Sequence, residues 1–208
     1  GGINGIDIED MAFTASVTIS DNFIWQNTGN GIHVGEVDPE SNLLIADNII
    51  TDNAGSGIDF GQGTTIVEGS VTIEDNVIGA WYGEIPPFGY TSFSGNGGTG
   101  IYVWELGMTG TMTIDSNIIS ENGATFGDGI GVYTVGACPD AENPERGLHI
   151  TDNVIGAWYF WYDEVYNKGV KGNYDDGIEI YRVLPAAVVS IDGNIISENE
   201  GDGIDFGI

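Results

Sequence analysis

Apolar and polar residues alternate in a short stretch that recurs six times along the chain. In the copy at Val71–Ile78 (VTIEDNVI), the apolar residues Val71 and Ile73 alternate with polar ones before a turn-forming Asp-Asn pair, and Val77 and Ile78 follow it. The asparagines that mark the six copies are Asn22, Asn48, Asn76, Asn117, Asn153 and Asn194. An apolar period of two predicts β-strands, so each copy supplies two very short strands separated by a turn.

A second stretch, Gly-Ile-x-apolar, follows every copy and supplies a third strand. It occupies residues 31–34, 57–60, 100–103, 129–132, 177–180 and 203–206, with one more copy at 5–8. The markers lie 26, 28, 41, 36 and 41 residues apart. Strands this short cannot pair as hairpins, and they bury their apolar side only by stacking on the next unit. The repeat therefore predicts a parallel β-helix with strands of successive coils about 4.8 Å apart.

Stacking sets equivalent residues of successive coils above one another. The isoleucine two positions after each marker, such as Ile24 or Ile119, is expected inside the coil. The marker asparagines are expected to form a hydrogen-bonded ladder at a turn. A second asparagine lies five residues after the marker in four copies, at Asn27, Asn53, Asn122 and Asn199. In the other two copies we expect Trp81 and Trp158 to replace this second asparagine.

The residues of this repeat resemble the right-handed parallel β-helix repeats of the pectate-lyase-like superfamily, including its carbohydrate-binding and sugar-hydrolase type. The resemblance implies an all-β fold, a single-stranded right-handed β-helix of about six coils, with residues 1–208 forming one domain. It leaves function open, because this architecture is shared by lyases, hydrolases, adhesins and passive surface proteins.

Charge narrows the choice of partner. The chain has 4 Lys and Arg against 32 Asp and Glu, a formal net charge of −28. Such a surface repels nucleic acid and anionic membranes and attracts cations. No apolar run approaches the ~18–20 residues of a membrane span. Cys138 has no partner for an internal disulfide and is interpreted as an incidental thiol.

Three aspartates form a candidate metal site. Asp128, Asp176 and Asp202 each directly precede the glycine of a Gly-Ile-x-apolar stretch, so they should stack on neighbouring coils. Clusters of oxygen ligands suit Ca²⁺. The alternative is a solvated acidic face suited to a salty habitat.

Two acidic motifs offer weak catalytic candidates. The stretches 174–182 (YDDGIEIYR) and 201–206 (GDGIDF) look like the acidic motifs of pectin-hydrolysing β-helix glycosidases, which would make Asp176, Asp202 and Asp205 the catalytic carboxylates. However, the order of the two motifs is reversed, and the Gly-His-Gly and Arg-x-Lys elements of that family are absent. The missing partners favour a protein without enzymatic activity.

The two longest insertions, 79–99 and 156–176, are rich in aromatic residues. The candidate contact residues in them are Trp81, Tyr82, Trp158, Tyr159, Trp161 and Tyr162. Three interpretations remain open: the loops pack on each other, they form a protein interface, or they bind a glycan.

The two ends of the repeat present the same type of strand. Gly5, Ile6 and Asp7 at one end, and Gly203, Ile204 and Asp205 at the other, are the candidates for an axial contact with another copy or with adjoining coils. Because the chain begins with Gly-Gly and has no signal peptide, we expect a processed product or part of a longer polypeptide. We predict a non-catalytic, extracellular structural solenoid, a surface or filament-forming protein with an acidic face that cations stabilise. The alternative is a glycan-binding or polysaccharide-cleaving module.

Overall fold

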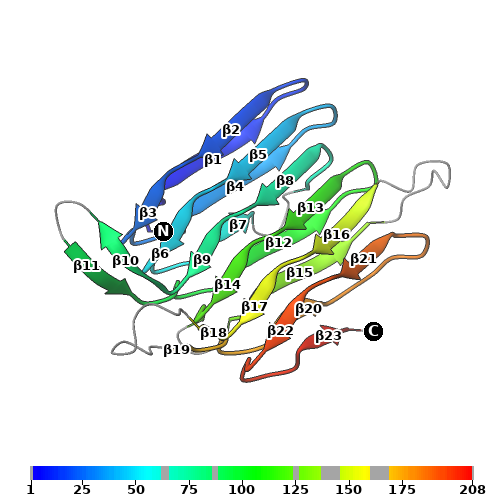
Figure 1. Ribbon diagram of the computed structural model, residues 1–208. Helices are drawn as coiled ribbons and strands as arrows, with labels where there is room; N and C mark the ends of the chain where they lie inside the picture. Colours follow the sequence, from blue (N-terminus) through cyan, green and yellow to red (C-terminus); the bar gives the residue numbers. More distant parts are fainter. Residues whose placement is uncertain are drawn as a thin grey trace.

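The computed structural model describes residues 2–61, 66–85, 89–123, 127–136, 146–159 and 169–207, and the regular structure in these ranges is entirely β. Short strands stack into a flattened solenoid with three parallel sheets (Figure 1). Each coil contributes one strand to each sheet, so neighbouring strands of a sheet come from successive coils. This arrangement confirms the parallel β-helix predicted from the repeat.

The first sheet contains seven strands. Their order is β1 (Ile6–Met11), β4 (Ile32–Val37), β7 (Ile58–Phe60), β12 (Ile101–Leu106), β15 (Ile130–Val135), β20 (Ile178–Ile180) and β23 (Ile204–Phe206). These strands begin within the Gly-Ile-x-apolar stretches, and their isoleucines are in register from Ile6 and Ile32 through to Ile204. The middle residue of each stretch faces outward, as the alternation predicts.

The other two sheets contain six strands each. The second sheet is β2 (Ser16–Ser20), β5 (Asn42–Ala46), β8 (Ser70–Glu74), β13 (Thr111–Asp115), β16 (Gly147–Thr151) and β21 (Val189–Asp192). The third sheet is β3 (Phe23–Trp25), β6 (Ile49–Thr51), β9 (Val77–Gly79), β14 (Ile118–Ser120), β17 (Val154–Gly156) and β22 (Ile195–Ser197). The solenoid therefore has six coils of three strands, and β23 adds one further strand to the first sheet.

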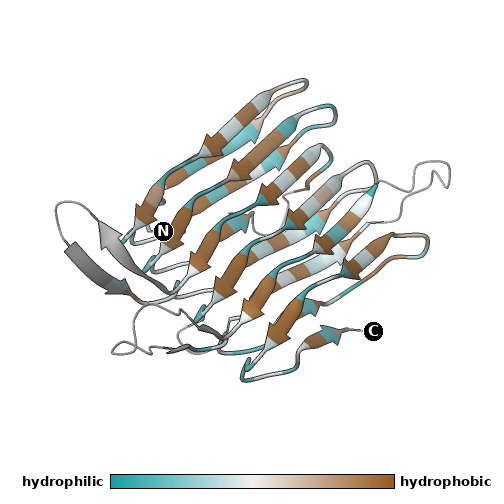
Figure 2. Cartoon of the chain, in the orientation of Figure 1, coloured by the Kyte–Doolittle hydropathy of each residue, from teal (hydrophilic) through white to brown (hydrophobic). Residues whose placement is uncertain are grey.

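Stacked aliphatic side chains fill the interior. Hydrophobic segments recur in the strands of successive coils and are coloured brown in Figure 2. The predicted isoleucine row of the third sheet is buried, with Ile50, Ile78, Ile119 and Ile155 fully inaccessible. Ile24 in the first coil is 6% exposed. Inward-facing isoleucines thus stack on isoleucines, which explains why the position two after the marker does not vary.

The marker asparagines form the expected ladder. Asn76 is typical: its main-chain N–H and its side-chain Nδ2 both donate to Oδ1 of Asn117 at 3.0 Å, and Nδ2 also donates to the carbonyl of Ile45 at 2.9 Å. Each buried amide therefore fixes the same turn in its own coil and in its neighbours.

The second asparagines, such as Asn53 and Asn122, form a ladder of their own, and this ladder corrects the prediction for Trp81 and Trp158. Trp81 and Trp158 do not replace its asparagines, because Asn96 and Asn173 fill the same positions. Nδ2 of Asn53 donates to Oδ1 of Asn96 at 2.9 Å, and Nδ2 of Asn122 donates to Oδ1 of Asn173 at 3.1 Å. The physical reason is that each insertion begins and ends at the same turn of the coil. The chain then returns to the regular path, where Asn96 or Asn173 takes the usual position of the asparagine.

Both insertions contain an antiparallel strand pair at this turn. The first pairs β10 (Trp81–Ile85) with β11 (Gly89–Phe93), and the second pairs β18 (Trp158–Tyr159) with β19 (Gly169–Val170). They directly follow β9 and β17, which are two coils apart, as the sequence spacing predicts. Trp161, Tyr162 and Cys138 lie outside the described residues.

Candidate cation site on the first sheet

Three aspartates occupy the same turn of successive coils, just before the first sheet. The main-chain N–H of Asp176 donates to Oδ1 of Asp128 at 3.3 Å, and the N–H of Asp202 donates to Oδ1 of Asp176. The carboxylates of Asp128 and Asp176 thus each accept a hydrogen bond from the coil that follows. These bonds give the aspartates a structural role at the turn.

That structural role does not require a charge. In the first coils, neutral asparagines perform it: Oδ1 of Asn4 accepts from the N–H of Asn30 at 2.9 Å, and Oδ1 of Asn30 accepts from the N–H of Ser56 at 2.8 Å. An asparagine oxygen therefore suffices as the acceptor. The negative charge of the later coils is an addition that the fold does not explain.

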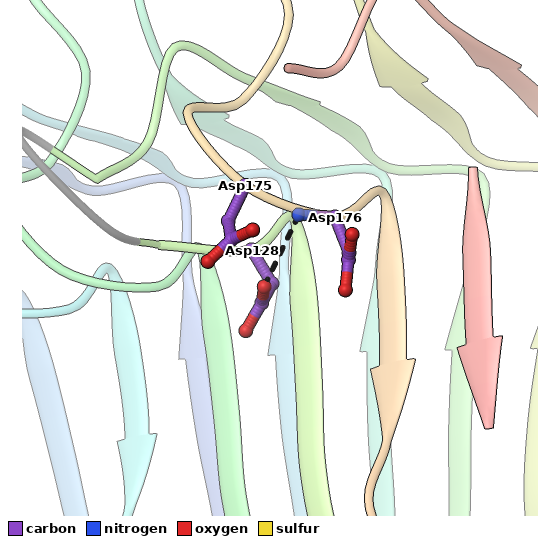
Figure 3. Close-up of side chains that lie close together, drawn as sticks. All are labelled: Asp128, Asp175 and Asp176. Atoms are coloured by element: carbon purple, nitrogen blue, oxygen red, sulfur yellow. Dashed lines mark hydrogen bonds between the residues drawn. The ribbon is translucent and has the colours of Figure 1, made fainter. Parts of the chain in front are cut away.

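The aspartates belong to a dense group of carboxylates. One oxygen each from Asp128, Asp175 and Asp176 lie within 4.8 Å of one another, and so do oxygens of Asp176, Glu179 and Asp205. Figure 3 shows the first three side by side, with the hydrogen bond that links Asp176 to Asp128. We refer to these five residues as the acidic cluster, which Asp176 joins into one.

The acidic cluster differs in membership from the site expected from the sequence. Asp202 belongs to neither group of ligand atoms, whereas Asp175 and Glu179 do. The signal for Glu179 was its outward middle position in Gly-Ile-x-apolar, in register with Asp205. Asp175 had only the signal of a doubled aspartate, because it lies in a turn where the repeat does not predict side-chain direction.

Burial and mutual repulsion disfavour the charged state of the acidic cluster. Asp128 is 8% exposed, and its burial, followed by the charge of Glu179, raises its pKa to about 7. The hydrogen bond from Asp176 opposes this shift, while the charges of Asp175 and Asp176 add to it. The pKa values of Asp176 and Glu179 are also raised, first by desolvation and then by neighbouring carboxylates. A bound proton or a cation would relieve this repulsion.

A row of stacked aromatic rings lies beside the acidic cluster on the outer face of the first sheet. The rings of Trp104 and Tyr133 are 4.3 Å apart at 8°, and those of Tyr133 and Tyr181 are 4.9 Å apart at 5°. Tyr181 directly follows β20 and is 52% exposed. The sequence prediction placed aromatic contacts in the two insertions and did not include this row. Its signal was an aromatic residue immediately after three consecutive Gly-Ile-x-apolar stretches.

Comparison with known families agrees with this architecture. A family model described as a right-handed β-helix region matches residues 3–84, which cover the first three coils. This match to the first part of the chain and the three stacked parallel sheets of the structure fit the fold of a right-handed parallel β-helix. No curated protein and no solved structure matches it. The acidic cluster lies in later coils than the match, so the match identifies the fold and carries no information about the site.

The first aromatic loop of the β-helix packs on its own solenoid. Trp81 and Phe93, at the base of the first strand pair, contact Phe23 of β3 with ring centroids 5.5 and 5.4 Å apart. Phe93 also contacts Trp25 at 5.2 Å. The insertion from the third coil therefore reaches back to the first coil. The side chains of Tyr82, Trp158 and Tyr159 are outside the described part of the structure.

The candidates for an axial contact lie on the two outermost strands of the first sheet. Gly5 precedes β1, which contains Ile6 and Asp7, and Gly203 precedes β23, which contains Ile204 and Asp205. This sheet has one strand more than the other two. Pairing β1 of one copy with β23 of another would therefore leave one strand position vacant in the second and third sheets.

The weak catalytic candidates divide between different positions. Asp176 and Asp205 share one group of carboxylates with Glu179, and Asp202 lies outside it.

Elsewhere on the first sheet, Nδ1 of His33 lies 2.8 Å from Oδ2 of the buried Asp59. That pair is on the second and third coils, whereas the acidic cluster lies on the fifth and sixth coils and on β23. No helix in the described ranges is long and apolar enough to cross a membrane.

Proposed function

We propose that this β-helix is a non-catalytic structural solenoid of an extracellular or cell-surface assembly, and that its acidic cluster binds a divalent cation, Ca²⁺ above others. One observation carries the proposal. Aspartates stand in the later coils at ladder positions where asparagines serve in the first coils. A charge that the fold does not need, and that burial opposes, indicates a role in binding.

The spacing of the ligand atoms suits this ion. Two oxygens bound to one Ca²⁺ at about 2.4 Å lie at most about 4.8 Å apart. The oxygens within each group of the acidic cluster meet this limit. Ca²⁺ accepts six to eight oxygen ligands, so waters and carbonyl groups would complete its coordination. The bound ion would offset the burial and the repulsion by Glu179 that raise the pKa of Asp128.

The test is thermal unfolding at pH 8 in CaCl₂, in MgCl₂ and in NaCl at matched ionic strength. We expect Ca²⁺ to raise Tm more than the other two salts, because a ligand that binds only the folded state stabilises it by mass action. Asp176→Asn should remove this gain, since Asp176 belongs to both groups of carboxylates. Asp75→Asn is the matched control, because Asp75 is an exposed acid on the far side of the coil. Equal effects of the three salts would refute a specific site and leave a solvated acidic face.

A structural role also requires contacts beyond one solenoid. β1 and β23 are the outer strands of the first sheet and offer main-chain groups to adjoining coils. Electron microscopy of native material would test this part of the proposal. Filaments or a continuous layer would support it, and discrete particles would contradict it.

The aromatic row favours a second candidate, glycan binding. Tyr133 and Tyr181 are 38% and 52% exposed and lie on the same outer face as the acidic cluster. Titration calorimetry with neutral and acidic oligosaccharides, with and without Ca²⁺, would detect such binding, and Tyr181→Ala should weaken it. Release of reducing or unsaturated sugars from polysaccharides, abolished by Asp176→Asn, would instead indicate a polysaccharide-cleaving enzyme.

A further inference from the structure

One ring of the aromatic row on the first sheet has an uncovered face. The rings of Trp104, Tyr133 and Tyr181 stack along the solenoid, so each face of the Tyr133 ring lies against a neighbour. Tyr181 is 52% exposed, against 38% for Tyr133. Its second face is turned towards β23, where Gly207 occupies the next place in the register. This face is the part of the row that a partner can cover.

The close approach of two main chains keeps the second face of the Tyr181 ring open. A Cβ atom on Gly207 would collide with main-chain atoms of Tyr181, so β23 cannot carry a side chain at this place. Two residues earlier, the register partners Glu179 and Asp205 bring carboxylate oxygens within 4.8 Å of each other. Because residues i and i+2 share one face of a strand, these carboxylates lie on the same outer face as the ring.

No ion pair within the described ranges compensates these carboxylates. The single ion pair found there joins His33 to Asp59, which do not belong to the acidic cluster. Arg182 directly follows Tyr181 but takes no part in an ion pair in this part of the structure. Desolvation and then neighbouring carboxylates raise the pKa of Glu179. A positive charge supplied by a binding partner would relieve this repulsion.

An uncovered ring beside paired carboxylates fits an organic cation. A cation over a tyrosine ring, within about 6 Å of its centroid, is attracted by the quadrupole of the ring. Arginine suits both parts of the site, because its planar guanidinium stacks on rings and donates several hydrogen bonds to carboxylates. A hydrated metal ion would use the carboxylates alone. A neutral sugar would cover the ring but leave the charges of Glu179 and Asp205 uncompensated.

We propose that Tyr181, Glu179 and Asp205 form a docking site for an arginine side chain of a basic partner protein. The docking site rests on the proposed cation-binding role of the acidic cluster and adds the ring as the group that selects arginine. The acidic cluster extends over β15, β20 and β23, which lie side by side (Figure 1). Three strands at this spacing span about 10 Å, which suits a segment with several basic residues.

Charge identifies this occupant among the alternatives. A chain of net charge −28 attracts a basic protein over long range and repels a second copy of itself. The ring then distinguishes the docking site from the rest of the acidic surface, because general attraction to carboxylates does not depend on Tyr181. A preference for arginine that requires this ring is therefore the property to be measured.

Titration calorimetry at pH 8, in 0.15 M NaCl with EDTA, tests the proposal with blocked peptides of equal length. In these peptides glycine alternates with arginine, lysine or citrulline. We expect the arginine peptide to bind at least about fivefold more tightly than the lysine peptide. The citrulline peptide should not bind, because citrulline keeps the shape of arginine without its charge. Tyr181→Ala should weaken binding of the arginine peptide about fivefold or more, and Tyr181→Phe should retain it.

Two single-charge variants locate the site. Glu179→Gln, beside the ring, should weaken binding of the arginine peptide by about fivefold or more. Asp75→Asn is the matched control, because it removes one charge at an exposed position on the far side of the coil. It should bind the peptide like the wild type. Circular dichroism verifies that each variant is folded, and Tyr181 is exposed enough for its substitution to leave the interior intact.

Several results would overturn the proposal. Equal affinities for arginine and lysine peptides, an unchanged affinity in Tyr181→Ala, or equal effects of Glu179→Gln and Asp75→Asn would show only a general attraction to acidic surface. Absence of binding, or a dimer that Tyr181→Ala dissociates, would also contradict it. Because EDTA removes Ca²⁺, peptide binding is measured independently of the thermal unfolding test. A gain in Tm with Ca²⁺ but no peptide binding would remove this inference alone, and the reverse result would remove the Ca²⁺ site alone.

Discussion

Replacing Asp128 by asparagine should stabilise the protein at neutral and alkaline pH. The substitution keeps Oδ1 as the acceptor for the N–H of Asp176, in the way that Asn30 accepts from Ser56. It removes a carboxylate that is 8% exposed and that the charges of Glu179, Asp175 and Asp176 repel. The change therefore separates the charge of this side chain from its structural role.

The pKa of Asp128 gives both the sign and the size of the effect. Its ordinary value of 3.8 is raised to about 7 in the folded state. The folded protein thus holds this proton more tightly than the unfolded chain, and stability is lost as pH rises from about 4 to about 7. At about 1.4 kcal/mol per pKa unit the ceiling is about 4 kcal/mol, and water and counterions around the half-exposed neighbours reduce our expectation to about 2 kcal/mol.

Urea unfolding between pH 4 and pH 8, without divalent cations, measures this gain. Asp128→Asn should be about 2 kcal/mol more stable than the wild type at pH 8, with the difference shrinking towards pH 4. CaCl₂ at pH 8 should narrow the difference in stability between the variant and the wild type. The reason is that Ca²⁺ should stabilise the wild type more, since the wild type alone retains the full set of carboxylate ligands. Asp75→Asn, at an exposed position, should stay within about 0.5 kcal/mol of the wild type at every pH. A variant that is no more stable at pH 8, with an unchanged slope between pH 4 and pH 7, would refute the reasoning.

Two further substitutions test the interior by urea unfolding. Ile119→Ala opens a cavity in a fully buried row with a coil on either side and should cost ~2–5 kcal/mol, whereas Thr113→Ala on the outward face should cost less than about 1 kcal/mol. Equal losses would show that inside and outside are wrongly assigned. Asn122→Ala leaves the amide of Asn96 and the carbonyl of Ile78 without their partner and should cost about 3 kcal/mol or more. Asn199→Ala, at the partly exposed end of the same ladder, should reduce the free energy of unfolding clearly less. Small losses of stability in both variants would show that the ladder contributes little.

The sequence predicted the fold well because each coil repeats the same local physics. Alternation around the marker asparagines identified the strands, and the fixed isoleucine at positions such as Ile50 and Ile119 identified the interior. The prediction was wrong where the period is interrupted. Trp81 follows the third strand of its coil directly, whereas Asn96 lies beyond an antiparallel strand pair. Spacing along the chain could not show that the ladder resumes after a detour of this kind.

The acidic cluster was only partly predictable for a different reason. The repeat places residues that share a coil position, so it found Asp128, Asp176 and Asp202. It could not find which carboxylates converge from different positions, and the structure joins Asp175, Glu179 and Asp205 to the first two. The aromatic row was missed for the same reason, since Trp104, Tyr133 and Tyr181 stack across coils from outside the aromatic loops.

Departures from the repeat therefore indicate where function is located on this solenoid. The repeat itself explains every inward isoleucine and both asparagine ladders, and these features would be needed in any β-helix. It does not explain why Asp128 and Asp176 occupy, in later coils, the turn position that Asn4 and Asn30 occupy in the first coils, because asparagine meets the same geometric need without the repulsion. This extra charge opposes folding at neutral pH unless something binds it, and a bound cation would account for it.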